Sequence, residues 1–213
     1  MSVSVGGKHG DTAFVNAVLL CLTTQHNWLM VALAAAVCFG GLVTALSLFE
    51  RAHSAGGRMR LALGMAAALT GGLTAWTTHF TGMLGYDPGL ELRYDLGLTL
   101  ASFGIAVIAG LGTALIAFLG RTVVARMAAG VFGIAGVAAM HFVGMSAVRL
   151  QGFVSWDPAV VVAAVVMGTL FAAAAGWVHA RGRWRGTLGA ALLATLAIAS
   201  LHFTAMGAVS INA

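Results

Sequence analysis

Six apolar runs, each more than 20 residues long, take up most of this 213-residue chain. As a helix rising about 1.5 Å per residue, each run can cross a hydrocarbon core of about 30 Å. Lipid offers no hydrogen-bond partner to the backbone, so such segments must be helical. Only 8% of the residues are charged, whereas soluble domains carry about 25%. The runs cover residues 28–49, 60–84, 96–119, 123–148, 158–180 and 186–209. The predicted fold is all-α: a polytopic membrane protein with six transmembrane helices arranged as three helical hairpins.

The basic residues predict how these helices are oriented. Eight of the 11 lysines and arginines lie in the first, third and fifth connections: Arg51, Arg58, Arg60, Arg121, Arg126, Arg181, Arg183 and Arg185. Short loops rich in lysine and arginine stay in the cytoplasm, so both termini are expected on the extracytoplasmic side. The formal charge of +5 follows from this loop pattern and indicates no nucleic-acid partner. The partner that the composition implies is the lipid bilayer.

Residues 1–27 precede the first run and are expected to form an extracytoplasmic segment. A cleaved signal peptide is disfavoured, because Lys8 is the one firm positive charge and Asp11 and Asn16 interrupt a short apolar stretch. A short helix in the membrane interface fits this pattern better. The six-helix membrane domain is expected to cover residues 28–210.

A short phrase of the form His-Phe-x-small-Met closes the second, fourth and sixth runs. The copies begin at His79, His141 and His202, so the steps between them are 62 and 61 residues. Before the first, third and fifth runs, an asparagine or aspartate follows a histidine or aromatic residue, and these Asx residues are good helix N-caps. The predicted caps are Asn27, Asp95 and Asp157. The chain is therefore interpreted as three copies of one hairpin, at about residues 26–84, 94–148 and 156–209.

Each phrase carries a methionine four residues after its histidine, and this spacing places both side chains on one face of a helix. The methionines are Met83, Met145 and Met206. Glycine recurs in the second helices of the first two hairpins, where it favours close helix packing in lipid, although glycine is also commoner in membrane helices generally. These glycines are Gly64, Gly71, Gly72, Gly130, Gly133 and Gly136. If these second helices pack innermost, the three phrases converge on one pocket near the outer face.

Histidine and methionine together favour a soft metal ion. Imidazole binds copper, zinc, iron and nickel, and thioether sulfur favours Cu(I). No cysteine thiolate or carboxylate accompanies the phrases, so structural zinc, calcium and magnesium fit poorly. Neutral ligands in a low-dielectric setting also favour a monovalent ion. The predicted cofactor is copper, as Cu(I), and its predicted ligands are His79, His141, His202, Met83, Met145 and Met206.

Other roles stay open for these residues. A histidine inside a membrane helix is functional by default, but it can also hydrogen-bond between helices, ligate haem or relay protons. Methionine also fills gaps in apolar packing. His26, at the outer boundary, and Met140, next to His141, are candidate additional ligands. The sequence contains no nucleophile triad, carboxylate pair or phosphate loop, so the chain is not expected to be an enzyme.

The three phrases, the Asx caps and the six-run plan together resemble the MHYT domain family, named for Met-His-Tyr-Thr. The resemblance covers about residues 26–210. The motif's tyrosine is replaced by Phe80, Phe142 and Phe203, and its leading methionine is present only as Met140. The three histidines match the motif residue by residue. The resemblance implies a sensor module of the bacterial inner membrane that binds copper and senses oxygen, carbon monoxide or nitric oxide.

Three functions follow as hypotheses. In the first, a sensory module holds copper with a position open to a diatomic gas ligand (O2, CO or NO). The second is copper handling or delivery, and the third is haem binding by two axial histidines. Family members are often fused to cytoplasmic domains that make or break cyclic di-GMP, whereas this sequence ends at Ala213, directly after the last run. We therefore expect a membrane or cytoplasmic signalling partner to receive the signal.

Overall fold

The computed structural model describes residues 23–120, 122–150 and 153–212. Most of the predicted N-terminal interfacial segment, residues 1–22, lies outside the described residues. Within the described part the fold is all-helical, with six long helices and four short strands. The helices are α2 (Trp28–Ser54), α3 (Gly57–Leu84), α4 (Leu96–Leu119), α5 (Val123–Ser146), α6 (Pro158–His179) and α7 (Arg183–Gly207). The all-helical fold is thus confirmed, and each helix matches one predicted apolar run to within a few residues.

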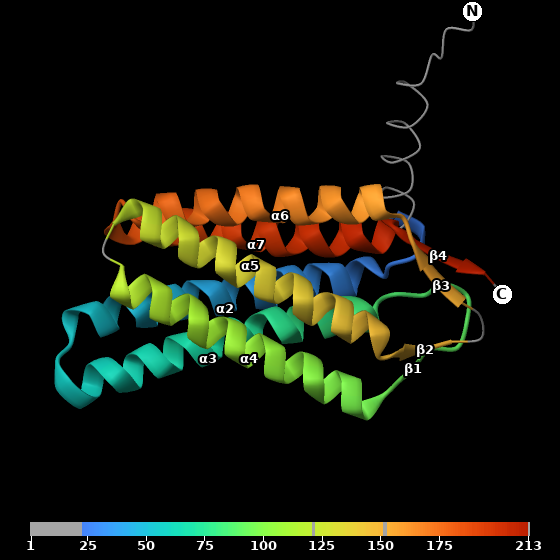
Figure 1. Cartoon of the computed structure of the whole chain (residues 1–213), viewed down its shortest axis with the longest axis horizontal. Helices are drawn as coiled ribbons and strands as arrows, with labels where there is room; N and C mark the ends of the chain where they lie inside the picture. Colours follow the sequence, from blue (N-terminus) through green and yellow to red (C-terminus); the bar gives the residue numbers. More distant parts are fainter. Residues whose placement is uncertain (1–22, 121, 151–152, 213) are drawn as a thin grey trace, which may run out of the picture.

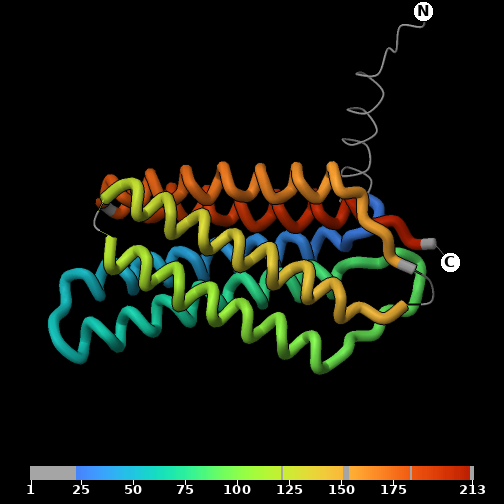
Figure 2. Tube along the Cα trace, in the orientation of Figure 1, coloured from blue at the N-terminus to red at the C-terminus, as the bar shows by residue number. Residues whose placement is uncertain are grey.

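The helices run along the long axis of the molecule and consecutive helices are antiparallel (Figure 1). The tight turns that join α2 to α3, α4 to α5 and α6 to α7 lie together at one end of the bundle, here the turn end (Figure 2). The opposite end, here the strand end, carries two short antiparallel pairs (Figure 1). The pairs are β1 (Arg93–Tyr94) with β2 (Val148–Arg149), and β3 (Phe153–Trp156) with β4 (Val209–Asn212).

The three hairpins close in the same way at the strand end. In each, the backbone N–H of the residue that caps the first helix donates to the carbonyl of the residue directly after the second helix, its C-cap. The bonds join Asn27 to Gly85 (2.8 Å), Asp95 to Ala147 (2.8 Å) and Asp157 to Ala208 (3.0 Å). The side chain of each capping residue also accepts a backbone N–H from the first turn of its own helix. The hairpins are therefore copies in backbone geometry as well as in sequence.

The six helices form a ring in which neighbours follow chain order and α2 closes against α7. Helix α5 also contacts α3 and α7 across the ring, so the second helices of the hairpins face the bundle axis. Burial agrees with this arrangement, because α3 buries nine residues and the first helix beside it, α4, buries four.

Small residues bring neighbouring hairpins into backbone contact. A Cβ atom added at Gly72 on α3 would collide with the carbonyl oxygen of Ala106 on α4. The next junction repeats this contact, with Gly130 on α5 against the carbonyl oxygen of Ala172 on α6. Such close approach is the usual basis of helix association in lipid. The predicted role of these glycines in packing is confirmed, and the contacts join the second helix of one hairpin to the first helix of the next.

Five helices are long and apolar enough to cross a membrane: α2, α4, α5, α6 and α7. Helix α3 is not among them, although it has 28 residues. Its threonines and glycines lower its mean hydropathy. Because one side of α3 is buried against other helices, fewer of its residues have to be apolar to face lipid. These apolar helices make the chain a multi-pass membrane protein.

Replacing Gly72 by alanine is expected to destabilise the protein, because the new Cβ would push α3 away from the Ala106 carbonyl. Overpacking of this kind costs about 1–3 kcal/mol. The matched control is Gly40→Ala on α2, where an added Cβ meets no atom within 4 Å. Thermal unfolding in detergent, followed by circular dichroism, should give a lower Tm for Gly72→Ala alone. Equal Tm values for the two variants would contradict a tight α3–α4 contact.

Asp95 forms an acid-sensitive contact outside the membrane-spanning segments. Its carboxylate accepts the backbone N–H of Leu98 and pairs with Arg149 at 3.2 Å, and both contacts lower the pKa of Asp95. A lowered pKa gives stability that is present above the ordinary value of about 3.9 and is lost as the pH falls through the folded value. Asp95→Asn keeps a capping oxygen and removes the charge. Its Tm should therefore fall less than that of the wild type between about pH 5 and pH 2; parallel curves would refute this role for Asp95.

Candidate metal centre

The histidines of the three phrases meet on the axis of the bundle. His79 lies on α3, His141 on α5 and His202 on α7, and all three are buried. Their Nδ1 atoms form a triangle with sides of 3.2 Å between His141 and His79 and 3.3 Å for the other two pairs. The rings stand edge to face, with interplanar angles of 76–84°. The structure therefore shows the convergence expected from the repeat, with one histidine from each hairpin.

No arrangement of protons satisfies all three contacts at once. A neutral imidazole nitrogen either carries a proton and donates or has a lone pair and accepts. Among three nitrogens two must be alike, so at least one side of the triangle joins two lone pairs or two N–H groups. A cation at the centre removes this conflict, because all three lone pairs can point at it. The nitrogens are thus better arranged for a cation than for a hydrogen-bond network.

The size of the triangle also fits a metal ion. A near-equilateral triangle with sides of 3.2–3.3 Å has its corners about 1.9 Å from its centre, close to the about 2.0 Å between zinc and a histidine nitrogen. The same spacing argues against haem between two of these histidines, because a porphyrin iron separates its axial nitrogens by about twice the metal–nitrogen distance. Among the described residues, these three histidines are the one group of three or more potential histidine, cysteine or carboxylate ligands close enough to share an ion.

The opposite ring nitrogens pack against the small residue of a neighbouring phrase. A Cβ atom added at Gly82 would lie 3.2 Å from Nε2 of His202, and one at Gly144 would lie 2.7 Å from Nε2 of His79. The small residue of the phrase therefore makes room for the imidazole of another hairpin. The third phrase has Ala205 at this place, and it is fully buried.

In the described part of the chain the Nε2 atoms of the three histidines make no hydrogen bond, whereas a metal-binding histidine usually donates from its second nitrogen.

The three methionines form a second layer, one helical turn from the histidines toward the strand end. Met83, Met145 and Met206 are buried and pack together with Tyr86. Tyr94 lies against this layer, donates its hydroxyl to the carbonyl of Met83 at 3.4 Å, and has its pKa raised by burial. The predicted thioether ligands thus share one apolar layer beside the histidine triangle.

The phenylalanine of each phrase packs edge to face on the residue that precedes an Asx cap of another repeat. The ring centroids are 6.0 Å apart for Phe80 and Tyr94, 5.3 Å for Phe142 and Trp156, and 5.3 Å for Phe203 and His26. His26 therefore holds the place that Tyr94 and Trp156 hold in the other repeats. Its ring centroid lies 6.2 Å from that of His202, outside the Nδ1 triangle.

Met140, the other candidate additional ligand, lies on the side of the histidine triangle that faces away from the methionine layer. It is fully buried and packs in the central core with Ile134 and Leu201. Met140 therefore belongs to a different cluster from the three phrase methionines, whereas His26 packs against Tyr86 of the methionine layer, with ring centroids 5.2 Å apart.

A polar cluster at the turn end was not anticipated from the sequence. Arg126 Nη1 on α5 donates to Nδ1 of His179 on α6 at 2.9 Å and to Oε1 of Glu50 on α2 at 3.5 Å. Nε2 of His179 lies 3.0 Å from the same Glu50 oxygen, at an angle that does not suit a hydrogen bond. This ionic cluster also takes one residue from each hairpin. In the sequence, the cluster is indicated only by charged residues at the boundaries of two apolar runs, Glu50 and Arg126.

A family model described as "Bacterial signalling protein N terminal repeat", MHYT, matches residues 72–130 and 135–191. The two matches begin 63 residues apart, at 72 and 135, close to the step between His79 and His141. Each match runs from the middle of the second helix of one hairpin into the second helix of the next. The family unit is therefore the same repeat, counted from a different starting point.

Bacterial relatives cover most of the chain. An "uncharacterized signaling protein" of Caulobacter vibrioides is 38% identical over 91% of this chain and 24% of its own length. In Pseudomonas aeruginosa, the bifunctional diguanylate cyclase/cyclic di-GMP phosphodiesterase MucR is 32% identical over 88% of this chain and 28% of its own length. The cyclic di-GMP phosphodiesterase NbdA of the same organism is 35% identical over 86% of this chain and 24% of its own length.

The chain spans about a quarter of the length of these curated relatives. No solved structure matches it. The two family-model matches together cover more than half of the chain, and the chain belongs to the MHYT family of bacterial signalling proteins.

Proposed function

We propose that this chain is a sensory membrane module that holds copper, as Cu(I), through His79, His141 and His202. The observation that carries the proposal is the triangle of Nδ1 atoms, with sides of 3.2–3.3 Å and one corner from each hairpin. A signalling role accords with the family and with the relatives, which are signalling proteins.

The surroundings of the triangle favour Cu(I) over other ions. Three neutral imidazoles in an apolar bundle compensate the charge of a monovalent ion better than that of a divalent one. The thioethers of Met83, Met145 and Met206 lie in the next layer and suit a soft ion. Calcium and magnesium would need oxygen ligands, and no carboxylate joins the histidine group within the described residues.

All six helices are proposed to cross the bacterial inner membrane, with the strand end outside. The bridge between His26 and Tyr86 ties the start of α2 to the segment after α3. If α2 crosses the bilayer, α3 must therefore return across it. The turn end carries most of the arginines, which favours the cytoplasmic side. Both ends of the hairpin repeat then lie on the extracytoplasmic side.

Each of the three ligands comes from a different hairpin, and this arrangement suits a sensor. Bound copper would supply a soft centre at which a diatomic gas (O2, CO or NO) can bind. A change at the centre would alter how the three hairpins pack, provided that the gas binds one packing state more tightly than another. The ionic cluster of Glu50, Arg126 and His179 joins the same hairpins at the turn end. A cytoplasmic or membrane partner, such as an enzyme of cyclic di-GMP turnover, could read the rearrangement there.

Copper delivery is less well supported than sensing. A carrier needs ligands along its path, and the axis between the histidines and the turn end is lined mainly by alanine, glycine and other apolar residues. The histidine triangle is therefore proposed as a resident site.

Purified protein is expected to bind one Cu(I) per chain, and the triple variant His79→Ala/His141→Ala/His202→Ala none. Loss of a single histidine should weaken binding by more than the about 10–100-fold that follows loss of an outer-shell partner. Met145→Leu should weaken it less, because three nitrogens remain. The measurement is an anaerobic competition with a chromophoric Cu(I) chelator.

The matched control for this titration is His53→Ala at the turn end. It should bind copper as the wild type does, and circular dichroism should show that every variant keeps its helices. Copper binding that survives the triple histidine change, or an equal loss in His53→Ala, would overturn the metal assignment.

Carbon monoxide added to the Cu(I) form is expected to give a C–O stretching band in the infrared spectrum. The band should be lost in His141→Ala and kept in His53→Ala. Copper binding with no such band would contradict the gas-binding part of the proposal alone. A Soret band in the purified protein would instead support haem.

A further inference from the structure

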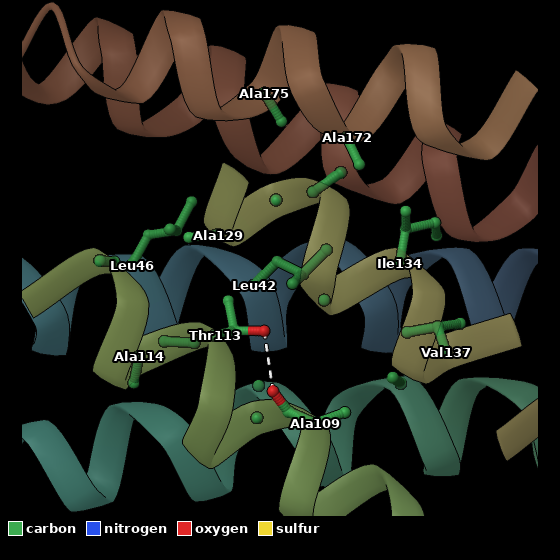
Figure 3. Close-up of a pocket in the computed structure, with 18 of the residues that line it drawn as sticks. Leu42, Leu46, Ala109, Thr113, Ala114, Ala129, Ile134, Val137, Ala172 and Ala175 are labelled. Carbon is green, nitrogen blue, oxygen red and sulfur yellow. Dashed lines mark hydrogen bonds between the residues drawn. The ribbon is translucent and has the colours of Figure 1, made fainter. Parts of the chain in front are cut away.

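A cavity of about 210 Å³ lies on the bundle axis and is lined by residues of all six helices. We call it the axial cavity; part of its wall is drawn in Figure 3. Its polar lining residues are Thr113, Arg126 and His179. The Thr113 hydroxyl donates to the carbonyl of Ala109 in its own helix at 2.8 Å (Figure 3), and Arg126 donates to His179. The wall is therefore apolar except where it reaches the ionic cluster.

The other end of the cavity lies beside the histidine triangle. Three of its lining residues, Ala75, Val137 and Ile198, each stand four positions before a histidine of the triangle. That spacing is about one helical turn, or 5.4 Å. The fully buried side chain of Met140 forms part of the same end. A molecule in the cavity would thus lie next to the histidine layer, with the flexible Met140 side chain at the boundary.

The size and polarity of the cavity restrict its occupant. Enclosed apolar cavities stay dry, and an engineered one of about 150 Å³ binds benzene or xenon. Pockets for drug-sized ligands hold about 300–1,000 Å³, so a quinone or sterol ring system is too large. Close packing does not require every residue of the wall to be small. At Gly71, an added Cβ would meet only the Cβ of Ala45, at an ordinary 3.9 Å.

We propose that the axial cavity binds a small, uncharged, apolar molecule, no larger than about the size of benzene, that arrives through the bilayer. Water gains little in an apolar space of this kind, and the small apolar side chains of the wall offer contacts to a molecule without polar groups. The inference goes beyond the proposed metal site and does not depend on it, because no metal ligand is needed to bind the molecule.

The test uses xenon as the probe on metal-free, chelator-treated protein in lipid nanodiscs. Methyl groups of methionine and isoleucine are 13C-labelled, and their NMR shifts are followed with xenon pressure. The methyls of Met140 and Ile134, at the cavity, should shift along a saturating curve. Those of Met167 and Ile108, which are 37% and 67% exposed on the outside of the bundle, should show only a linear solvent effect.

A matched pair of variants locates the effect. Ala175→Leu places a larger side chain in the cavity wall, so the saturating shift should be lost. Ala36→Leu makes the same change on the exposed side of α2, so the shift should be kept. Linear shifts at all four methyls in the wild type would overturn the proposal. So would NOE contacts between the Met140 methyl and lipid acyl chains, because they would show that a lipid tail fills the cavity. Since copper is absent throughout, failure here leaves the metal assignment untouched.

Discussion

Backbone contact at small residues holds the helices of this bundle together. Lipid gives helices no hydrophobic reason to associate, so they hold together where their backbones can approach. Gly72 against Ala106 and Gly130 against Ala172 bind each hairpin to the next. In the ring that results, the second helices of the hairpins face the axis. Residues from three distant parts of the sequence then meet there at two levels, the histidine triangle and the ionic cluster.

The packing gives each letter of the repeated phrase a physical role. The histidine supplies one corner of the triangle, and the small residue leaves room for an imidazole of another hairpin. The phenylalanine packs edge to face on the residue before an Asx cap, and this contact needs a ring but no hydroxyl. The methionine joins an apolar layer one turn away. Contacts between hairpins therefore determine the residue type at each position of the phrase, and this explains why the phrase recurs once in each hairpin.

The sequence was sufficient to predict the features that depend on local pattern. The six helices follow from apolar run length, the Asx caps at Asn27, Asp95 and Asp157 from residue type and position, and the meeting of the histidines from the threefold repeat. The ionic cluster was missed because Glu50, Arg126 and His179 are far apart in sequence and come together only through the order of helices in the ring. The position of His26 before an Asx cap already matched it to Tyr94 and Trp156 in the sequence, and the structure adds the packing of its ring on Phe203. The threonines and glycines that lower the hydropathy of α3 are visible in the sequence, whereas the helices that cover its buried side are not.

The central claim is that three imidazole nitrogens from three hairpins share one soft metal ion. X-ray absorption at the copper K-edge of the loaded protein tests this claim most directly. We expect a Cu(I) edge and a first shell of three nitrogen scatterers at about 2.0 Å, with multiple scattering from imidazole rings. A first shell made only of sulfur, or one without the imidazole signature, would contradict it.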